Sequence, residues 1–442
     1  MTGAPQLSAQ LQWAARGLQA VQAGQSSTEW LGQCPGAIRP GVQALLLSAL
    51  RQLGRARALR QHLTPKTPAP AVDALLCLSL GLLVQDPPLY PEHTLVSQAV
   101  EAAKKEPRTQ ALAALINACL RRFGRERAAL MALTDRDPQA RWNHPLWWIE
   151  RLTKDHPQHW QAMLAQAQRR PPLVLRINTR RTSMADWLQR CQQAGLPVQV
   201  LGDVAVWLPQ PVPVQQIPGF EDGHCSVQDL AAQMAAPLLL DALGPAPQDR
   251  PWQLLDACAA PGGKTAHLIE RAGAQARVLA LDMDAQRLRR VTENLQRLGL
   301  EARTQVANAA RPDEWAEPGQ WFDGILIDAP CSASGIVRRH PDIAWLRRAQ
   351  DLDSLAAQQR ALLQGLWPRL RPGGFLLYGT CSVFKIEGEQ QVQTFVAHNT
   401  DALRMPAPGH LTPVKAGNGA PVGDNGVCEP DGFFYALLQK AG

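Results

Sequence analysis

The second half of the chain alternates short apolar runs with amphipathic stretches, and this alternation constrains the fold more than any other feature. From Cys225 onward, segments with helical periodicity separate the apolar runs "WQLLDAC", "RVLALD", "RTQVAN", "FDGILIDAP" and "FLLYGTC". A repeated strand-helix pattern predicts an α/β fold with a doubly wound, mostly parallel sheet. In such sheets ligands bind at the carboxyl ends of the strands, so the residues that end each run are the first candidates for a site.

The first part of the chain has a different pattern. Up to about Leu133, apolar residues recur every three or four positions with almost no alternation, which predicts an all-helical domain over residues 1–140. Its basic clusters have two interpretations, a surface that contacts RNA or ordinary solvated helix faces. The clusters consist of Arg51, Arg55, Arg57 and Arg60, of Lys104 and Lys105, and of Arg121, Arg122, Arg125 and Arg127.

Between these parts, residues 171–220 have the pattern of strand, helix, strand, strand, which predicts a small α+β module. Arg176 and Asn178 lie on and just after its first strand, followed by Arg180 and Arg181. Such side chains can hydrogen-bond to the phosphates of a nucleic acid, so we predict that Arg176 and Asn178 bind RNA. The strand-helix repeat then forms a third domain over residues 221–442.

Length and charge agree with this division. A chain of 442 residues has room for roughly three domains of ordinary size. A formal charge of +7 and a pI near 9.1 favour a polyanionic partner, because surface Lys and Arg release counterions from phosphates.

The cysteines and the apolar runs indicate where in the cell the protein is found. The nine cysteines form no Cys-x-x-Cys pair and no Cys/His group at zinc spacing, so we expect neither a disulfide framework nor a metal. The N-terminus lacks the pattern of a secretory signal, and the apolar run "ALLCLSLGLLV" is too short to span a bilayer. We therefore expect a cytoplasmic protein that does not associate with membranes.

The stretch "LLDACAAPGGKTAHLIE" (residues 254–270) resembles a phosphate-binding loop at first sight. A P-loop requires glycine where Cys258 stands, and the dinucleotide pattern Gly-x-Gly-x-x-Gly is absent. A strand, a tight glycine turn and a helix remain. The glycines allow a close approach to a ligand, and the helix N-terminus near Lys264 favours a negative group such as a carboxylate.

Two further strand ends carry polar residues. Asp282 ends the next apolar run, where a carboxylate can accept hydrogen bonds from ribose hydroxyls or cap the following helix, a role that Asp284 could also take. Asn308 ends the third run and is placed to touch an adenine edge. Together with the loop, these residues suit a nucleoside without phosphates, such as S-adenosylmethionine.

The last two runs end in cysteine, at Cys331 and Cys381, and serine follows each one. A lone cysteine is usually a small buried apolar residue, but two at strand ends suggest reactive thiols. Carbon 5 of a pyrimidine attacks a methyl sulfonium only after a thiolate has added to carbon 6. The second cysteine could assist the later elimination, and Asp328 could hydrogen-bond a cytosine that has been flipped out of its stem.

These motifs resemble those of a known family. "DACAAPGGKT", "DAPCSASGIVRRHPDIAWLRR", "GTCSV" with Glu387 shortly after, and "DGFFYALL" are similar to the RNA 5-methylcytosine methyltransferases with two active-site cysteines. The helical part, with "HTLVSQAVEAAKK" and "INACLRRF", resembles the antitermination-factor-like RNA-binding domain of the branch that acts on 16S ribosomal RNA. The resemblance implies a Rossmann-like methyltransferase domain that uses S-adenosylmethionine, and we expect a monomer.

The resemblance also implies roles for single residues. Cys381 becomes the covalent nucleophile and Cys331 the residue of product release. The chain departs from the family pattern at Asn308, where Asp is usual, and at Gly388, where Asn is frequent. The residues implied to bind the cofactor are Cys258, Ala259, Ala260, Pro261, Gly262, Gly263, Lys264, Asp282, Asn308 and Asp328.

The segment just beyond Cys331 is a further candidate for RNA contact. Guanidinium groups pair with phosphates and stack on bases, so we predict that Arg338, Arg339 and His340 bind RNA; the alternative is helix-surface charge.

Three other functions share parts of this pattern. A nucleotide-dependent dehydrogenase lacks a use for paired cysteines, and a non-catalytic RNA-binding or antitermination factor would not need them. A methyltransferase for carbon 5 of uracil has the same covalent chemistry, and only the family resemblance separates it from the cytosine enzyme.

Overall fold

The structure is a computed structural model that describes residues 6–412 and 429–442. The chain divides into two units that interleave along the sequence. The helical unit comprises Met1–Arg170 and Ile336–Ala349, and the sheet unit comprises Pro171–Gly335 and Gln350–Gly442, each within the described residues.

The helical unit has a large apolar core formed by its first seven helices. Helix α5 is apolar over most of its length and buried on nearly all sides, and α1, α3, α4, α6 and α7 pack around it. No helix in the described ranges is long and apolar enough to cross a membrane. The helices are α1 (Leu7–Gln22), α2 (Ser27–Gly32), α3 (Arg39–Leu50), α4 (Leu53–Leu63), α5 (Pro70–Leu83), α6 (Glu92–Lys105), α7 (Ala113–Thr134), α8 (Pro138–Trp142), α9 (Leu146–Asp155), α10 (Trp160–Ala167) and α16 (Ile343–Leu346).

The segment Ile336–Ala349 belongs to the helical unit although the sequence around it forms the sheet. The Arg51 guanidinium donates to the carbonyl of Arg338 at 2.7 Å, and the Ser27 backbone N–H donates to the Asp342 carboxylate at 2.8 Å. The Arg57 guanidinium lies 4.8 Å from the centre of the Trp345 ring. These contacts anchor the segment on α2, α3 and α4.

The first basic cluster does not form a solvated face. Arg51, Arg55 and Arg60 are all buried, at 7%, 9% and 8% exposure. Arg60 pairs with Asp73 at 2.8 Å and Arg55 with Asp135 at 2.7 Å. The prediction that this cluster could face RNA does not agree with its burial, because its charges hold the helices together. Exposed basic residues remain on α6 and α7, namely Lys104, Lys105, Arg121, Arg122 and Arg125.

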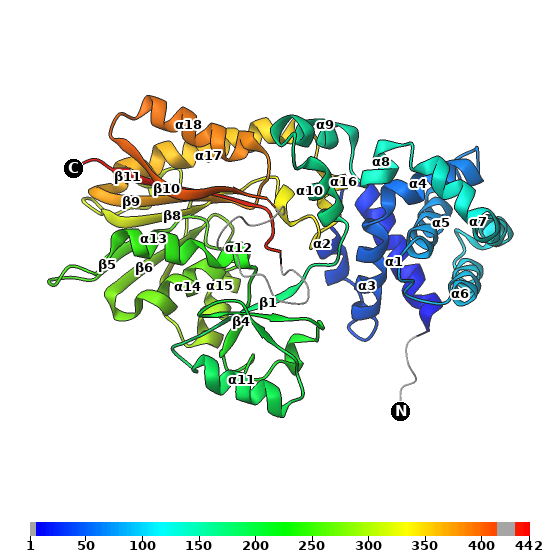
Figure 1. Ribbon diagram of the computed structural model, residues 1–442, viewed down its shortest axis with the longest axis horizontal. Helices are drawn as coiled ribbons and strands as arrows, with labels where there is room; N and C mark the ends of the chain where they lie inside the picture. Colours follow the sequence, from blue (N-terminus) through cyan, green and yellow to red (C-terminus); the bar gives the residue numbers. More distant parts are fainter. Residues whose placement is uncertain (1–5, 413–428) are drawn as a thin grey trace. The chain divides into compact units, whose positions relative to one another are not determined.

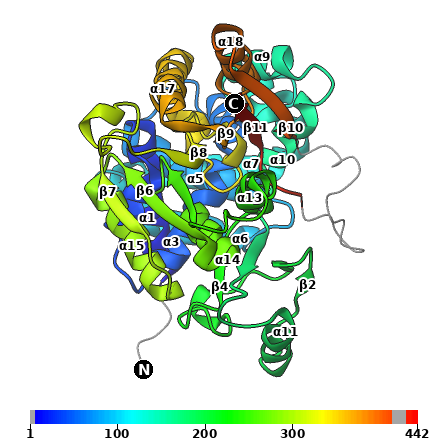
Figure 2. The same cartoon turned by 90° about the vertical axis from the view of Figure 1, so that its left-hand side faces the viewer.

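The sheet unit begins with a small antiparallel sheet. Helix α11 (Met184–Gln193) covers it and contributes Trp187 and Cys191 to its core, and Figure 2 shows this helix at the edge of the unit. The sheet has a strand beyond residue 220, because β4 pairs with β1 instead of joining the following strand-helix repeat. The strand order is β2 (Gln199–Val200), β3 (Ala205–Leu208), β1 (Leu173–Ile177) and β4 (Cys225–Val227).

The larger sheet confirms the predicted α/β fold. Neighbouring strands from β9 to β7 are parallel, while β11 and β10 add an antiparallel edge. In spatial order the strands are β10 (Ala402–Leu411), β11 (Phe433–Lys440), β9 (Leu370–Thr380), β8 (Phe322–Asp328), β5 (Trp252–Asp256), β6 (Ala276–Asp282) and β7 (Arg303–Val306).

Helices cover both faces of this sheet, as a doubly wound fold requires. Helices α17 (Asp351–Leu366) and α18 (Glu389–His398) lie on one face (Figure 1). The other face is covered by α13 (Ala235–Leu243), α14 (Gly263–Ala272) and α15 (Ala285–Leu298) (Figures 1 and 2).

Candidate active site

The candidate site lies at the carboxyl edge of the parallel strands. Because β9, β8, β5, β6 and β7 are neighbours and run in the same direction, the loops that follow them meet at this edge. Cys381 follows β9, Asp328 ends β8, the glycine loop follows β5, and Asp282 ends β6. The topology therefore brings together predicted residues that are more than one hundred positions apart.

The loop between β5 and α14 makes a tight turn. Gly262 has φ +96°, and a Cβ at this position would lie 3.1 Å from the Cα of Val291 on α15. The backbone conformation therefore favours glycine, and a side chain would also crowd α15. Just below the loop, the Thr265 hydroxyl donates to the Asp256 carboxylate at 2.6 Å, and burial raises the pKa of Asp256 to about 7. The pKa of Cys258, within the loop, is also raised by burial.

Asp282 is oriented by backbone donors. Its two carboxylate oxygens accept from the N–H of Asp284 at 3.0 Å and of Ala260 at 3.3 Å, and the residue is 4% exposed. It does not cap the next helix: Asp284 does so, by accepting from the N–H groups of Gln286 and Arg287. The capping interpretation therefore applies to Asp284, and Asp282 keeps acceptor capacity toward the site.

Asn308 lies in the turn that follows β7. Its side-chain oxygen accepts from the backbone N–H of Ala310 at 3.1 Å. An amide oxygen has a second lone pair, so this contact leaves an acceptor for another donor. The predicted contact with adenine stays a prediction.

Lys264 and Asp328 form an ion pair inside the site. Lys264 Nζ lies 2.6 Å from an Asp328 oxygen, and the Asp328 side chain is 28% exposed. Burial opposes the charge on Lys264, but the neighbouring Asp328 carboxylate raises its pKa above the ordinary value. Lys264 therefore supplies a permanent positive charge close to the thiol of Cys381.

The two cysteines lie in direct contact. Their Sγ atoms are 3.4 Å apart; Cys331 is 8% exposed and Cys381 is half-buried. The hydrogen bond with Cys381, burial, and the nearby charges of Cys381 and Glu387 raise the pKa of Cys331 well above its ordinary value. The arrangement therefore combines one accessible thiol with one protected, protonated thiol.

The loop after Cys331 has an unusual backbone. Ala333 has φ +59°, which costs a non-glycine residue of order 1–3 kcal/mol and is typical of functional sites. Gly335 donates its N–H to the Cys381 carbonyl at 2.9 Å and accepts from Gly432 at 3.0 Å. A side chain on Gly335 would collide with the Gly432 backbone. The "DGFF" segment thus helps to hold the cysteine loops together.

Glu387 was not among the predicted site residues, yet it is buried between the two cysteine loops. It accepts hydrogen bonds from Ser332 and Ser382, the residues that follow the cysteines. The Cys-Ser repeat was the signal in the sequence that could have identified it. The next residue, Gly388, has no space for a side chain, because a Cβ would lie 2.7 Å from the ring of Phe434.

Three of the predicted RNA-binding residues are buried. Arg176 is 1% exposed and pairs with Glu270 through two bonds of 2.8 and 2.9 Å, and Asn178, also 1% exposed, donates to the Gly223 carbonyl. Arg338 is 4% exposed. A direct RNA contact does not agree with this burial, and the side chains of Arg176 and Asn178 instead join elements of the fold. Arg339 and His340 are half-buried, and their RNA contact stays a prediction.

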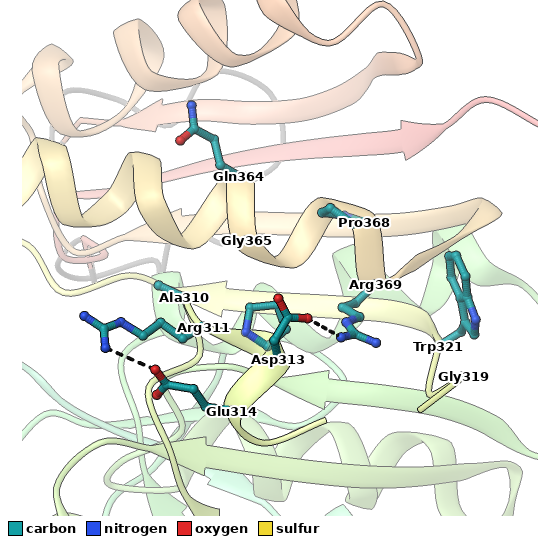
Figure 3. Close-up of a pocket in the computed structure, with 11 residues that line it drawn as sticks. Ala310, Arg311, Asp313, Glu314, Gly319, Trp321, Gln364, Gly365, Pro368 and Arg369 are labelled. Atoms are coloured by element: carbon teal, nitrogen blue, oxygen red, sulfur yellow. Dashed lines mark hydrogen bonds and ion pairs between the residues drawn. The ribbon is translucent and has the colours of Figure 1, made fainter. Parts of the chain in front are cut away.

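A separate hollow of about 690 Å³ lies between the loop after β7 and the end of α17 (Figure 3). Its charged side chains neutralise one another: Arg311 pairs with Glu314 at 3.1 Å, and Arg369 with Asp313 at 2.8 Å. None of the predicted site residues lines it. Within residues 6–412 and 429–442, no cluster of His, Cys, Asp or Glu is arranged to hold a metal ion.

Comparisons with known proteins identify a family that matches this chain. A family described as 16S rRNA methyltransferase RsmB/F matches residues 241–439, and a RsmF/B-like ferredoxin-like domain matches residues 144–215. The second match overlaps the small antiparallel sheet.

Two relatives share the description ribosomal RNA small subunit methyltransferase B. The protein from Citrobacter koseri is 43% identical over 354 residues, which cover 79% of this chain and 78% of the relative. The protein from Vibrio cholerae is 38% identical over 432 residues, 96% of this chain and 95% of the relative.

Among solved structures, NSun6 from Pyrococcus horikoshii, crystallised with SFG, is similar in fold. It has a TM-score of 0.56 at 19% identity and covers 67% of this chain and 98% of its own.

Proposed function

Because the chain belongs to the 16S rRNA methyltransferase RsmB/F family, we propose that it methylates carbon 5 of a cytosine in 16S ribosomal RNA through a covalent cysteine adduct. The family takes its methyl group from S-adenosylmethionine. The observation that carries the proposal is the pair of thiols 3.4 Å apart at the carboxyl edge of the sheet.

The residues at this edge fit S-adenosylmethionine, which when bound supplies an electrophilic methyl group on a sulfonium. Asp282 is a buried carboxylate with acceptor capacity, which suits ribose hydroxyls. The N-terminus of α14 follows a turn that favours glycine, and this helix end suits the methionine carboxylate.

Cys381 is the thiol suited to attack the base. It is half-buried and therefore within reach of a flipped-out nucleotide. The thiolate forms an S–C6 bond, and the displaced π-electrons make carbon 5 nucleophilic. Asp328 accepts a hydrogen bond from the exocyclic amine of cytosine; uracil presents a carbonyl oxygen at that position, so the carboxylate supports cytosine as the target.

Cys331 is placed for the elimination. Once Cys381 is bonded to the ring, the hydrogen bond and the charge of Cys381 no longer raise the pKa of Cys331. The Cys331 thiol then loses its proton to solvent more readily, and its thiolate can take the proton from carbon 5. The C5–H electron pair restores the C5=C6 bond, and the S–C6 bond breaks with return of its electrons to Cys381.

The helical unit supplies the RNA-binding surface in this proposal. The exposed residues of its predicted basic clusters lie on α6 and α7, which pack against one another. Surface Lys and Arg on adjacent helices gain affinity for a phosphate backbone through counterion release. We expect this surface to bind a stem of the ribosomal RNA.

Bisulfite mapping of 16S ribosomal RNA tests the proposal. In cells that lack the protein, one cytosine should lose its protection, and purified protein with S-adenosylmethionine should restore the protection in vitro. An unchanged cytosine pattern with a missing methylated uridine would instead establish the uracil reaction. An unchanged set of modified nucleosides would refute both.

A further inference from the structure

We infer that Glu387 is a positioning residue for the reaction, holding the Cys331 and Cys381 loops in the register that brings the two sulfur atoms into contact. This inference rests on the proposed function and deepens it. Glu387 itself touches neither sulfur through a hydrogen bond, so it acts through the two serines that follow the cysteines.

The geometry is that of one carboxylate shared by two loops. One oxygen accepts from the hydroxyls of Ser332 and Ser382, each at 2.5 Å. The other accepts from the Ser332 backbone N–H at 2.7 Å and from the side chain of Gln359 at 3.3 Å. Each serine is bonded to a cysteine through a single peptide unit, so a movement of either serine moves the adjacent sulfur.

Further hydrogen bonds hold the residues around Glu387 in place. The Ser382 hydroxyl lies 2.9 Å from that of Ser334, and Ser334 accepts from the Val383 backbone N–H at 3.0 Å. The carbonyl of Glu387 accepts from the hydroxyl of Tyr378 at 2.7 Å, which fixes the backbone that carries the carboxylate. Glu387 is 0% exposed, so water does not replace these donors.

The charge of Glu387 has a second effect. Within the described residues its hydrogen-bond partners are neutral donors, so the carboxylate charge is felt by the neighbouring thiols. It is one of the groups that raise the pKa of Cys331, whereas Lys264 adds positive charge near Cys381. The two similar side chains therefore stand in different electrostatic surroundings, as a nucleophile and a proton-transfer group require.

A purely structural role would give a different result, and the test is designed to separate the two. Glu387→Ala removes the link between the loops, while Glu387→Gln keeps an oxygen acceptor and removes the charge. Asp323→Asn is the matched control: Asp323 is also a buried carboxylate on the same sheet, bonded to Arg250 at 2.6 and 2.8 Å at the amino end of β8.

The experiment measures single-turnover methylation, S-adenosylmethionine affinity, Tm and alkylation of Cys331 by iodoacetamide as a function of pH. We expect Glu387→Ala to lower kcat about 100-fold, with the cofactor Kd changed less than about twofold, because misplaced reacting groups cost of this order. Glu387→Gln should restore kcat to within about tenfold of the wild type and allow alkylation of Cys331 at lower pH. Asp323→Asn should change kcat less than about threefold at a similar loss of Tm.

Equal kcat losses in Glu387→Ala and Asp323→Asn would overturn the inference, as would a parallel loss of cofactor affinity or the absence of rescue by Gln. If Glu387→Ala does not fold, Ser332→Ala and Ser382→Ala replace it. Their effects on kcat should be non-additive with Glu387→Gln because all three act through one network; additive effects would contradict it.

A failure of the proposed function has a separate signature. In that case the wild-type protein does not methylate the RNA, and the pH dependence of Cys331 alkylation alone decides the role of Glu387. An unchanged pH dependence of alkylation in both Glu387 variants would overturn the inference there too.

Discussion

The helical unit and the carboxyl edge of the larger sheet both bury ionisable side chains, but their surroundings differ. In the helical unit, Arg60 pairs directly with Asp73, and Arg51 donates to a backbone carbonyl. At the sheet edge, the Asp328 carboxylate pairs with Lys264 and yet stays 28% exposed. The buried pair in the helical unit stabilises the packing of its helices. The partly exposed Asp328 carboxylate keeps an acceptor that a substrate can use.

The thiols show the same contrast. Cys77 is buried in the helical core, where burial above all raises its pKa to about 12, so it behaves as a small apolar residue. Cys381 is half-buried, contacts a second thiol and lies near a permanent cation. The two thiols therefore differ in burial and in their neighbours, although the residue type is the same.

Replacement of the proposed nucleophile should have the largest effect. We expect Cys381→Ala to reduce methylation by more than about 1,000-fold, because carbon 5 is not activated without the S–C6 bond. The cofactor Kd should change less than about twofold. Methyl transfer from radiolabelled S-adenosylmethionine and calorimetry measure the two quantities, and Cys77→Ala serves as the matched thiol control. Retained turnover in Cys381→Ala would exclude it as the nucleophile.

Replacement of the second thiol should stop the reaction later. We expect Cys331→Ala to lower kcat about 100-fold and to accumulate a covalent complex of protein and RNA, because addition proceeds while elimination fails. The complex should survive denaturation and appear as a shifted band on a denaturing gel. Only free RNA, with normal cofactor binding, would contradict a role in release.

The paired charges of the helical unit should affect stability instead of catalysis. Arg60→Met leaves Asp73 without its partner and should lower the free energy of unfolding of this unit by about 3 kcal/mol. Arg122→Ala breaks an exposed pair with Glu126, with side chains 44% and 43% exposed, and should cost less than about 0.5 kcal/mol. Urea denaturation of the intact protein compares the two, and equal costs would remove the distinction between buried and exposed pairs.

Asp256 of the sheet unit and His144 of the helical unit should make contributions of opposite sign to the pH dependence of stability. The pKa of Asp256 is about 7 in the folded protein and about 3.9 when unfolded, so the folded state binds more protons and loses stability as pH rises through this range. Asp256→Asn should remove this loss, with a gain in stability at pH 8 that exceeds the gain at pH 5 by on the order of 2 kcal/mol.

The helical unit provides the internal control for that measurement. Burial lowers the pKa of His144 to about 4, so this unit loses stability as pH falls from the unfolded value of about 6.5 toward 4. Hydrogen exchange at pH 5 and pH 8, corrected for intrinsic rates, reports both units in one sample. A sheet unit that is as stable at pH 8 as at pH 5, in wild type and variant alike, would refute the prediction for Asp256.

The smallest effect concerns the exposed basic residues of the helical unit. Arg121→Ala with Arg125→Ala should weaken RNA binding about 3- to 10-fold and reduce the salt slope by about 1 to 2, because fewer counterions are released. Arg303→Ala with Arg311→Ala removes the same charge from the sheet unit and is the control. Equal effects in both pairs would mean that net charge, and not this surface, determines binding.

The sequence predicted the fold class and the family correctly, and the reason lies in local patterns. Alternating strands and helices identify the sheet, and a parallel topology places every strand end at one edge without further information. The thiol contact follows because Cys331 and Cys381 end neighbouring strands, β8 and β9.

The side-chain contacts within the site and between elements could not be predicted, because they join residues that are distant in sequence. Arg176 has the composition of an RNA contact, but its partner Glu270 is 94 positions away on α14, and no local pattern shows that pair. Glu387 follows the GTCSV motif closely, but its contact with Ser332, 55 positions away, is visible only in the structure. Side-chain partnerships between elements are therefore what the sequence pattern does not supply.

The interleaving of the units has a consequence for how the protein can be divided. The strand that ends at the Cys331 loop leads, without a spacer, into Ile336–Ala349, whose partners are Ser27, Arg51 and Arg57. A cut after Arg170 would leave a fragment that lacks a piece of its own interior, and the complementary fragment would carry that piece with nothing to dock against. Neither half is a freely transferable module, so the two must be produced together, and fragment complementation, not simple truncation, is the way to study them apart.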